Sequence, residues 1–457
     1  MKDLTTGNEA RLIFNFALPM LIGNVFQQLY TSVDGIIVGR VLGKGALAAV
    51  GISFPVTFLL ISLIMGVAMG TTILIAQYYG AGEMKKVKRT IDTAYIFLAV
   101  ASLIITVVGL LLSGPILTLL KVPADVYPLA KQYLNIIFIG ITAMFGYNSI
   151  SAILRGLGNS KTPLYFLIIA TLMNIGLDLL FIIVFKWGVA GAAWATIIAQ
   201  AFSFLIGIVY LNRTHELFRF NLREMKFDRE IFSLTFRIGL PNGIQHVMLS
   251  AGFMTLFRIV NEFGTAVTAA YTAATGIDSF ASMPAMNLSM AVSSFVGQNL
   301  GANKPERVKR GHLAALGMSV AISLVMTAVA ILLRKELISL YNMDPEVIYH
   351  GSRYLLIVGS FYVVFSVFFT TNGVLRGAGD TLTPLISTIL SLWLIRVPAA
   401  ALLSQKLGPD GIWWAGPVGM VTGMVFTVLY YRSGRWKKKV VVQKAAALEM
   451  VEPAEPR

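Results

Sequence analysis

Two carboxylates interrupt long apolar stretches in the first half of the sequence, Asp34 and Asp178. A charged side chain inside a membrane span costs about 2.5–3.5 kcal/mol on insertion scales, so a carboxylate kept in such a place usually has a function. Asn174 precedes Asp178 by four residues, and a helix therefore puts both side chains on one face. These residues are the first candidates for binding an ion or a proton.

A stripe of polar residues leads up to the first carboxylate. Gln27, Tyr30, Thr31 and Asp34 follow the spacing i, i+3, i+4, i+7, which places them on one helical face. The stripe therefore gives this helix one polar face that includes Asp34.

The candidate ligands lie at similar depths in three predicted spans. At a rise of about 1.5 Å per residue, Asp34 lies about 9 Å from the outer end of its helix, and Asp178 and Thr196 lie about 12 Å from theirs. Carboxylate, amide and hydroxyl oxygens gathered in this way suit a hard cation such as Na⁺. Two neighbouring carboxylates can equally share a proton, because their mutual repulsion opposes double ionisation.

Each carboxylate also has a purely structural interpretation. Asp178 could be a buried carboxylate that only hydrogen-bonds its neighbours, and Asp34 could be an interfacial residue that reaches the outer headgroups. The coincidence of the two at similar depth favours a shared site.

The composition requires a membrane protein. Of 457 residues, 56% are hydrophobic and only 13% are charged, and the mean hydropathy is +0.75. Soluble domains carry about 25% charged residues. The composition therefore excludes soluble enzymes and nucleic-acid-binding modules, and the net charge of +15 is interpreted as basic loops facing anionic lipid.

Twelve apolar runs are long enough for helices that cross a bilayer. They predict an all-α integral membrane protein with twelve transmembrane helices in two pseudo-symmetric six-helix bundles. The predicted spans are 12–39, 46–76, 90–112, 127–152, 162–185, 188–211, 233–262, 266–296, 312–333, 348–374, 383–404 and 411–431. The predicted domains are an N-lobe (1–211), a cytoplasmic linker (212–232), a C-lobe (233–432) and a disordered basic cytoplasmic tail (433–457).

The basic residues predict the orientation. Most of the 37 Lys and Arg fall on the side that holds both termini, including Lys85–Arg89, Lys304–Arg310 and Arg432–Lys439. The positive-inside rule makes that side cytoplasmic.

An internal repeat relates the two halves. Gln77–Arg89 recurs as Gln298–Arg310, and Leu154–Pro163 recurs as Leu375–Pro384, with the same separation in both pairs. Six predicted helices separate the copies, so the halves share one topology as a parallel repeat, an arrangement typical of alternating-access transporters.

The candidate site itself is not repeated. The counterpart of Asp178 is Ala399, and that of Asp34 is Leu256. Asp278 and Arg396 are further intramembrane charges; Asp278 has structural and functional interpretations, and packing or snorkelling is the favoured interpretation of Arg396. Pro19 interrupts the helix of Asp34 and predicts a kink that could couple ion occupancy to lobe geometry.

Several other chemistries have no support in the sequence. There is no cysteine, and the four histidines lack the spacing of a metal site. No P-loop motif indicates ATP use.

Five kinds of segment recur in one known family. They are Leu18-Pro19, Val33-Asp34-Gly35, the paired Leu-Arg-Gly-x-Gly-(Asn/Asp)-(Ser/Thr)-x-Thr-Pro motifs, Asn174-x-x-x-Asp178 and Gly188-x-x-Gly191-x-x-x-Ala195-Thr196. Through them the chain resembles the multidrug and toxic compound extrusion (MATE) family over residues 10–432. The resemblance implies a secondary active efflux transporter that exports organic, mostly cationic compounds by antiport with Na⁺ or H⁺, without an enzymatic activity or a cofactor. It further implies that Asp34, Asn174, Asp178 and Thr196 form the cation or proton site, and that Gln27, Tyr30 and Thr31 line the adjoining substrate cavity.

Acidic residues of the second half distinguish the branches of that family. One branch also uses acids in helices 7 and 10, whereas here the tenth predicted span has none and Glu262 lies at the outer end of the seventh. The chain is therefore more similar to the DNA-damage-inducible branch. We expect a monomer in the inner or plasma membrane, contacting small organic cations and lipids but no nucleic acid. A lipid-linked saccharide flippase of the same superfold is the alternative.

Overall fold

The computed structural model describes residues 2–214, 219, 221 and 223–442, and within these residues it contains helices and no strand. The predicted all-α class is confirmed. In the described part of the chain, eight helices are long and apolar enough to cross a membrane, or ten if each of two bent helix pairs is counted as one span. With α2 and α9, the long helical segments coincide with the twelve predicted spans.

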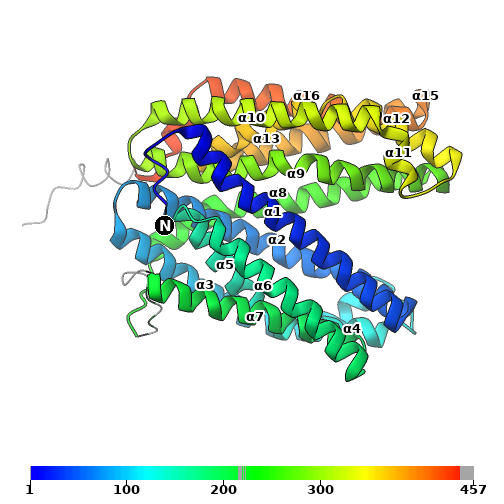
Figure 1. Ribbon diagram of the computed structural model, residues 1–457, viewed down its shortest axis with the longest axis horizontal. Coiled ribbons are helices and arrows are strands. Elements are labelled where there is room, and N and C mark those ends of the chain that lie inside the picture. The colour runs from blue at the N-terminus through cyan, green and yellow to red at the C-terminus, as the bar shows by residue number, and fades with distance from the viewer. Residues whose placement is uncertain (1, 215–218, 220, 222, 443–457) are drawn as a thin grey trace, which may run out of the picture. The chain divides into compact units, whose positions relative to one another are not determined.

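The chain divides into two compact units (Figure 1). Unit 1 is formed mainly by Pro19–Gly239, and unit 2 by Asp3–Leu18 together with the chain from Leu240 onward. Two helices therefore change units along their length, α1 at Leu18–Pro19 and α8 at Gly239–Leu240. The lobe boundary predicted from the sequence falls between two helices instead. The unit against which a helix packs depends on contacts between residues far apart in the sequence, which local patterns do not give.

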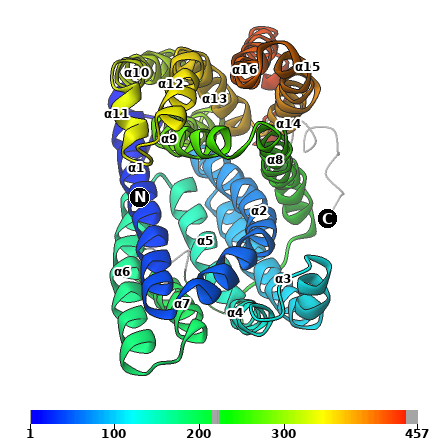
Figure 2. The same ribbon diagram turned by 90° about the vertical axis from the view of Figure 1, so that its right-hand side faces the viewer.

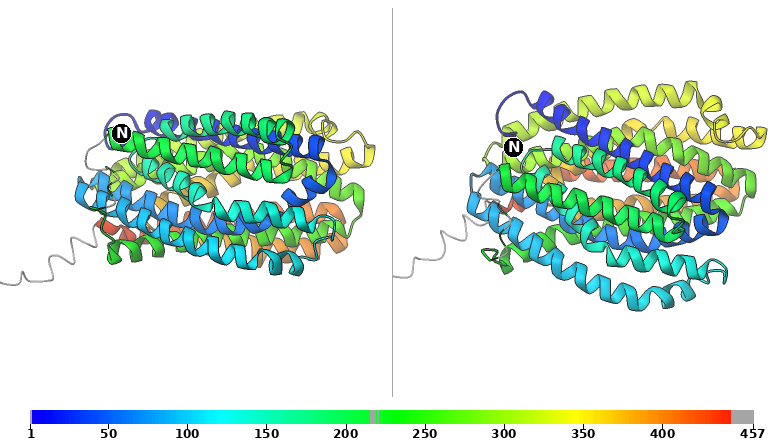
Figure 3. Two further views of the ribbon diagram at one scale, coloured as in Figure 1. Left: turned by 90° about the horizontal axis from the view of Figure 1, so that it is seen from below. Right: turned by 60° about the horizontal axis from the view of Figure 1, so that its bottom comes forward.

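Unit 1 contains most of α1 and the helices up to the first turns of α8. α2 packs along α3 and α5, and α6 packs along α7; the two views of Figure 3 follow α2 and α3 side by side. The elements are α1 (Glu9–Ile37), the π-helical turn η1 (Val38–Leu42), α2 (Lys44–Gly80), α3 (Met84–Leu119), α4 (Tyr127–Ile139), α5 (Ile141–Gly156), α6 (Lys161–Asp178), the π-helical turn η2 (Leu179–Val184), α7 (Val189–Thr214) and the start of α8 (Arg229–Asn261).

Unit 2 repeats this order of helices. α9 packs against α10, α12 and α13, and α15 packs against α16 (Figure 2). The elements are the remainder of α8, α9 (Thr265–Gly301), α10 (Pro305–Leu332), α11 (Arg334–Ser339), α12 (Pro345–Gly359), α13 (Tyr362–Gly377), α14 (Leu382–Thr388), the π-helical turn η4 (Ile389–Arg396), α15 (Val397–Leu407), α16 (Pro409–Arg432) and the 3₁₀ turn η5 (Arg435–Lys439).

The repeated motifs build the same turn in both units. Gly158 and Gly379 have φ angles of 80° and 89°, a left-handed conformation that favours glycine. The residue after each glycine then accepts a hydrogen bond from the first turn of the following helix: Asn159 Oδ1 accepts from the Thr162 amide at 3.1 Å, and Asp380 Oδ1 accepts from the Thr383 amide at 3.2 Å. The local geometry thus follows the repeat predicted from sequence.

The helices differ from the predicted spans in several places. The fourth and tenth predicted spans are each broken into two helices, at Gly140 and at Ser360–Phe361, with a 50° bend. α7 extends to Thr214, and α8 begins at Arg229 after Asp228, whose Oδ1 accepts from the amides of Glu230 and Ile231 at 3.0 Å. Of the predicted tail, 433–442 contains η5, and the remainder lies outside the described residues.

Candidate cation-binding site

Asp34 and Asp178 are brought together inside unit 1. Asp34 lies in the last turns of α1 and Asp178 at the end of α6, and their carboxyl groups are in hydrogen-bonding contact. The Asp178 side chain is fully buried. Two unit charges about 4 Å apart repel by about 4 kcal/mol at an effective dielectric constant of about 20. The pair therefore requires a proton or a cation for stability.

Asn174 holds one of these carboxylates and connects it to α7. With the amide oriented to satisfy its neighbours, Asn174 Nδ2 donates to Asp178 Oδ2 at 2.9 Å and Oδ1 accepts from the Thr196 amide at 3.1 Å. Asn174 is 1% exposed, so these hydrogen bonds do not compete with bulk water. One side chain thus fixes α6 to α7 at the depth of Asp178.

Tyr30 closes the arrangement from α1. Its hydroxyl lies 3.2 Å from Thr196 Oγ1. The stripe predicted on α1 is therefore turned toward α7 at Tyr30 and toward α6 at Asp34. The three helices α1, α6 and α7 converge on one polar centre, in agreement with the depth estimate.

The site contains acceptor oxygens that have no hydrogen-bond partner among the described residues. They comprise one oxygen from each carboxylate and one each from an amide and a hydroxyl, and they are Asp34 Oδ1, Asp178 Oδ1, Gln200 Oε1 and Thr171 Oγ1. A buried acceptor without a hydrogen bond costs free energy, so these oxygens favour a bound cation, proton donor or water. No group of three or more His, Asp or Glu that could hold a metal occurs in the described part of the chain. The donor set, with only two carboxylates, fits Na⁺ rather than a divalent ion.

A small cavity lies beside this centre. It offers about 10 Å³ to the centre of a water-sized sphere, which is close to the minimum for one water molecule. Such a space accepts one water molecule or a bare inorganic ion but not an organic drug. Its lining residues are Gln27, Tyr30, Leu167, Ala170, Thr171, Asn174, Thr196, Ala199 and Gln200.

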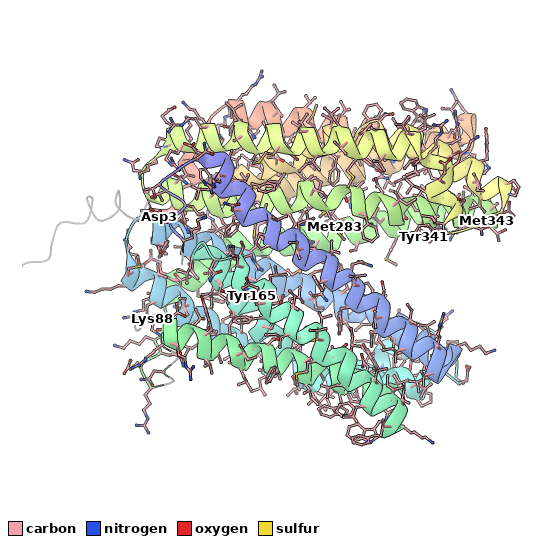
Figure 4. All side chains as sticks on the ribbon, viewed as in Figure 1. Asp3, Lys88, Tyr165, Met283, Tyr341 and Met343 are labelled. Atoms are coloured by element: carbon pink, nitrogen blue, oxygen red, sulfur yellow. The ribbon has the colours of Figure 1, made fainter. Side chains whose placement is uncertain are left out.

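The structure places the predicted cavity residues differently. Gln27 and Tyr30 line this cavity, whereas Thr31 does not; its side chain is exposed, and its hydroxyl donates to the Gln27 carbonyl at 3.0 Å. Pro19 lies inside α1 and is the first residue of its unit 1 portion. Figure 4 draws the side chains of these helices.

Sequence reasoning missed three members of the site. Thr171 and Gln200 line the cavity, and the Tyr133 hydroxyl lies within electrostatic range of both carboxylates. Gln200 follows Thr196 by four residues, so its position on the same helical face was available from the sequence. Tyr133 comes from α4, and only the fold brings it to α1 and α6.

Comparison with known proteins gives one consistent family. A family model described as MatE matches the chain twice, at residues 19–180 and 241–402. The probable multidrug resistance protein YpnP of Bacillus subtilis (strain 168) is 36% identical over 441 residues, which cover 95% of this chain and 97% of that protein. The probable multidrug resistance protein NorM of Thermotoga maritima is 28% identical, covering 96% and 95% of the two chains.

Solved structures agree with this relationship. A structure described as the outward-facing conformation of a multidrug resistance MATE family transporter of the MOP superfamily has a TM-score of 0.89 and 25% sequence identity. The match covers 97% of this chain and 99% of that one. A structure described as MATE in the bent conformation also has a TM-score of 0.89 and 25% identity, over 97% and 98% of the two chains.

Proposed function

The chain belongs to the MATE family of multidrug efflux transporters, and from this premise we propose that Na⁺ or H⁺ bound at Asp34 and Asp178 drives its export of organic cations. The family membership makes the protein a multi-pass membrane transporter of small molecules and not an enzyme, with no cofactor. Beyond this membership, we propose the coupling ion, the charge of the substrates and the residues that bind the ion and the substrates.

One observation supports this proposal above the others: two carboxyl groups are in contact with each other, with unpartnered acceptor oxygens around them, beside a cavity of ionic size that Tyr30, Asn174 and Thr196 line. An empty site leaves two like charges facing each other, and a proton or Na⁺ removes that repulsion. The free energy of unit 1 therefore depends on occupancy, which is the requirement for coupling a gradient to a conformational change.

Exchange follows if an organic cation and the ion compete for the same negative charge. The ion enters from the side on which it is concentrated, neutralises Asp34 and Asp178 and lowers the affinity for a cationic drug. The drug then leaves to that side, and the unloaded carboxylates favour binding of the next drug from the cytoplasm. Asn174 and Thr196 maintain the site geometry, while Gln27 and Tyr30 line its cavity.

We place the protein in the inner or plasma membrane as a monomer, surrounded by lipid, with both termini in the cytoplasm. The basic segments on the side of the termini support this orientation. Pro19 removes one backbone hydrogen bond from α1, and the proposal makes this position the bend through which occupancy at Asp34 changes the helix.

The alternative of a lipid-linked saccharide flippase receives less support. Recognition of a pyrophosphate favours arginine side chains, whereas the charged side chains that meet inside unit 1 are the carboxylates Asp34 and Asp178.

Purified protein in proteoliposomes tests the proposal. We expect ethidium efflux under a Na⁺ gradient alone or a proton gradient alone, and at least a tenfold loss of that efflux in Asp34→Asn and Asp178→Asn. Asp125→Asn, an exposed carboxylate in the loop before α4, is the control and should keep the wild-type rate. Undiminished gradient-driven efflux in both site variants would refute the coupling role. Flipping of a fluorescent lipid-linked saccharide that persists in Asp34→Asn would support the alternative.

A further inference from the structure

A buried arginine lies in the membrane-spanning part of unit 2. Arg396 is the last residue of η4 and is only 8% exposed. Its Nε has no hydrogen-bond partner among the described residues, and its guanidinium lies 5.6 Å from the centre of the Phe253 ring. A guanidinium is permanently charged and costly to bury, so this position requires an explanation.

A carboxylate lies within electrostatic range of this arginine. Asp278 of α9 accepts a hydrogen bond from the Tyr354 hydroxyl of α12 at 3.3 Å. Arg396 acts electrostatically on Asp278 and on Tyr354. The structure gives no direct salt bridge between Asp278 and Arg396 among the described residues, so their attraction acts through space in a medium of low dielectric constant.

Aromatic rings fix the Tyr354 hydroxyl beside Asp278. Tyr354 meets Trp413 edge-on, with ring centres 5.2 Å apart, and Tyr271 stacks on Trp413 at 5.6 Å with an interplanar angle of 5°. Trp413 and Tyr354 are each 1% exposed. The cluster is therefore packed into the core of unit 2, and its charges cannot move apart without disturbing that core.

The repeat relates this cluster to the cation site of unit 1. In the register that pairs Leu154–Pro163 with Leu375–Pro384, Tyr354 is the counterpart of Tyr133, which is near Asp34 and Asp178. In the same register Arg396 is the counterpart of Ile175, the neighbour of Asn174 on α6. Tyr133 and Tyr354 thus hold matched positions, one near two carboxylates and the other near Asp278 and Arg396.

A glycine supports this correspondence in space. Gly416 is the counterpart of Thr196 in the register that pairs Gly188 with Gly408, and a Cβ built on it would be 3.6 Å from Arg396 Nη2. The guanidinium therefore lies beside the counterpart of the hydroxyl-bearing residue of unit 1. On the next turn, a Cβ at Gly419 would be 2.8 Å from Arg396 Cβ. Glycines on α16 allow η4 and its arginine to approach this closely.

We propose that Arg396 is a tethered cation which permanently occupies the unit 2 counterpart of the ion site, so that Asp278 takes up no coupling ion. This inference rests on the proposed function of Asp34 and Asp178 as the ion site. It makes the Asp278 and Arg396 charges of unit 2 balance each other and leaves ion exchange to unit 1 alone. The two units then share a fold but differ in charge. Arg396 supplies in unit 2 the positive charge that an ion from solution supplies in unit 1.

Ion uptake by the purified full-length protein tests the proposal, with ²²Na⁺ binding and proton release as the two probes. Asp278→Asn should leave the uptake of the wild type unchanged. Arg396→Met should add about one equivalent of uptake, and Arg396→Met combined with Asp278→Asn should remove it again. Arg396→Lys keeps the charge and should behave as the wild type.

Two outcomes overturn the proposal: a loss of ion uptake in Asp278→Asn alone, or no gain in a folded Arg396→Met protein. Uptake that survives Asp34→Asn would instead contradict the proposed function, because that variant lies in unit 1. The two failures are therefore distinguishable.

Thermal unfolding keeps the proposal testable if Arg396→Met folds poorly. Asp278→Asn and Arg396→Met should each lower the Tm, and the double variant should be more stable than the sum of the two changes predicts. Arg353→Met removes the partner of Asp410 elsewhere in unit 2, and its effect should add to that of Asp278→Asn. Simple additivity of Asp278→Asn and Arg396→Met would overturn the pairing.

Discussion

Arg307 of α10 and Glu9 of α1 form an ion pair within unit 2, with Nη1 3.2 Å from Oε1. Both side chains are mostly buried, at 14% and 17% exposure. Arg307 also donates to the Gly7 carbonyl at 2.9 Å and to Asn299 Oδ1 at 3.0 Å. The repeated segment Gln298–Arg310 therefore holds the residues that lead into α1.

Neighbouring residues of the same segment extend this contact. The Leu4 amide donates to Gln298 Oε1, and its carbonyl accepts from Asn299 Nδ2, each at 3.0 Å. Lys304 Nζ donates to the Thr5 carbonyl at 3.0 Å. Asp3 begins the N-terminal part of unit 2 and lies at the opposite end of that unit from Met343 (Figure 4).

Replacing Arg307 by Gln should destabilise unit 2. Hydrogen bonds to charged groups contribute about 1.5–3 kcal/mol each when protected from solvent, and several are lost together. We expect a clear fall in Tm of the detergent-solubilised protein. The control is Lys309→Gln, which breaks the exposed ion pair with Glu306 and should leave the Tm unchanged. Equal Tm values for Arg307→Gln and the wild type would contradict the structural role of this contact.

The sequence predicted the helices better than their interruptions. The spans and their order follow from runs of apolar residues, and Asp34 and Asp178 meet because helical periodicity fixes the faces on which they lie. The 50° bends at Gly140 and at Ser360–Phe361 were not predicted, since a glycine or serine in an apolar run is compatible with a straight span. The predicted third span begins at residue 90 because only apolar residues were counted toward a bilayer-crossing run. The helix α3 itself begins earlier, at Met84, and includes the polar turns before that span.

Long-range contacts explain the remaining differences. The assignment of Asp3–Leu18 to unit 2 depends on Gln298, Asn299 and Arg307, which lie in the other half of the sequence. Tyr133 joins the candidate site through α4, and no local pattern relates it to Asp34. Such contacts follow from packing of the completed fold and not from periodicity.

The N-terminal segment should be sensitive to acid through Asp3. Burial raises the pKa of this carboxyl, but hydrogen bonds from Thr5 and Thr6 and the charge of Lys304 outweigh it, so that the pKa is lowered from its ordinary value of 3.8. A lowered pKa in the folded state gives stability that is present above pH 4 and is lost as the pH falls through the folded value. We expect the Tm of the wild type to fall more than that of Asp3→Asn between pH 5 and pH 3. Parallel Tm curves would show that Asp3 contributes nothing.

The hydroxyl of Thr196 should contribute to ion affinity. Tyr30 and Asn174 meet this residue from α1 and α6, so removal of Oγ1 breaks one of the contacts that join three helices. Thr196→Val should weaken the binding of the coupling ion severalfold, whereas Thr196→Ser should restore it. Thr57→Val is a matched control, because that hydroxyl donates to the Ser53 carbonyl of its own helix and lies outside the site. Isotope or proton-release titration measures the affinities, and identical values for Thr196→Val and the wild type would exclude the contact from the site.

Pro19 should affect transport more than binding. A proline inside α1 lacks the amide that would donate to the residue four positions earlier, which makes bending at this point less costly. Pro19→Ala should lower gradient-driven ethidium efflux at least severalfold while the ethidium affinity of the purified protein changes little. Pro55→Ala replaces another proline within a helix of unit 1 and serves as the control. A comparable loss of efflux in both variants would assign the effect to helix stiffening in general.

Close backbone packing between α2 and α8 gives the final prediction. A Cβ at Gly239 would lie 2.5 Å from the Gly66 carbonyl oxygen, and one at Gly70 would lie 2.3 Å from the Thr235 carbonyl oxygen. Backbone atoms cannot rotate away as a side chain does, so Gly239→Ala forces the helices apart at a cost of about 1–3 kcal/mol. Gly51→Ala on the same α2 meets no atom within 4 Å and should gain up to about 1 kcal/mol of helix propensity. Thermal unfolding should therefore shift in opposite directions for the two variants, because only Gly239 lies where α8 packs into unit 1; a Gly239→Ala protein as stable as Gly51→Ala would contradict this helix contact.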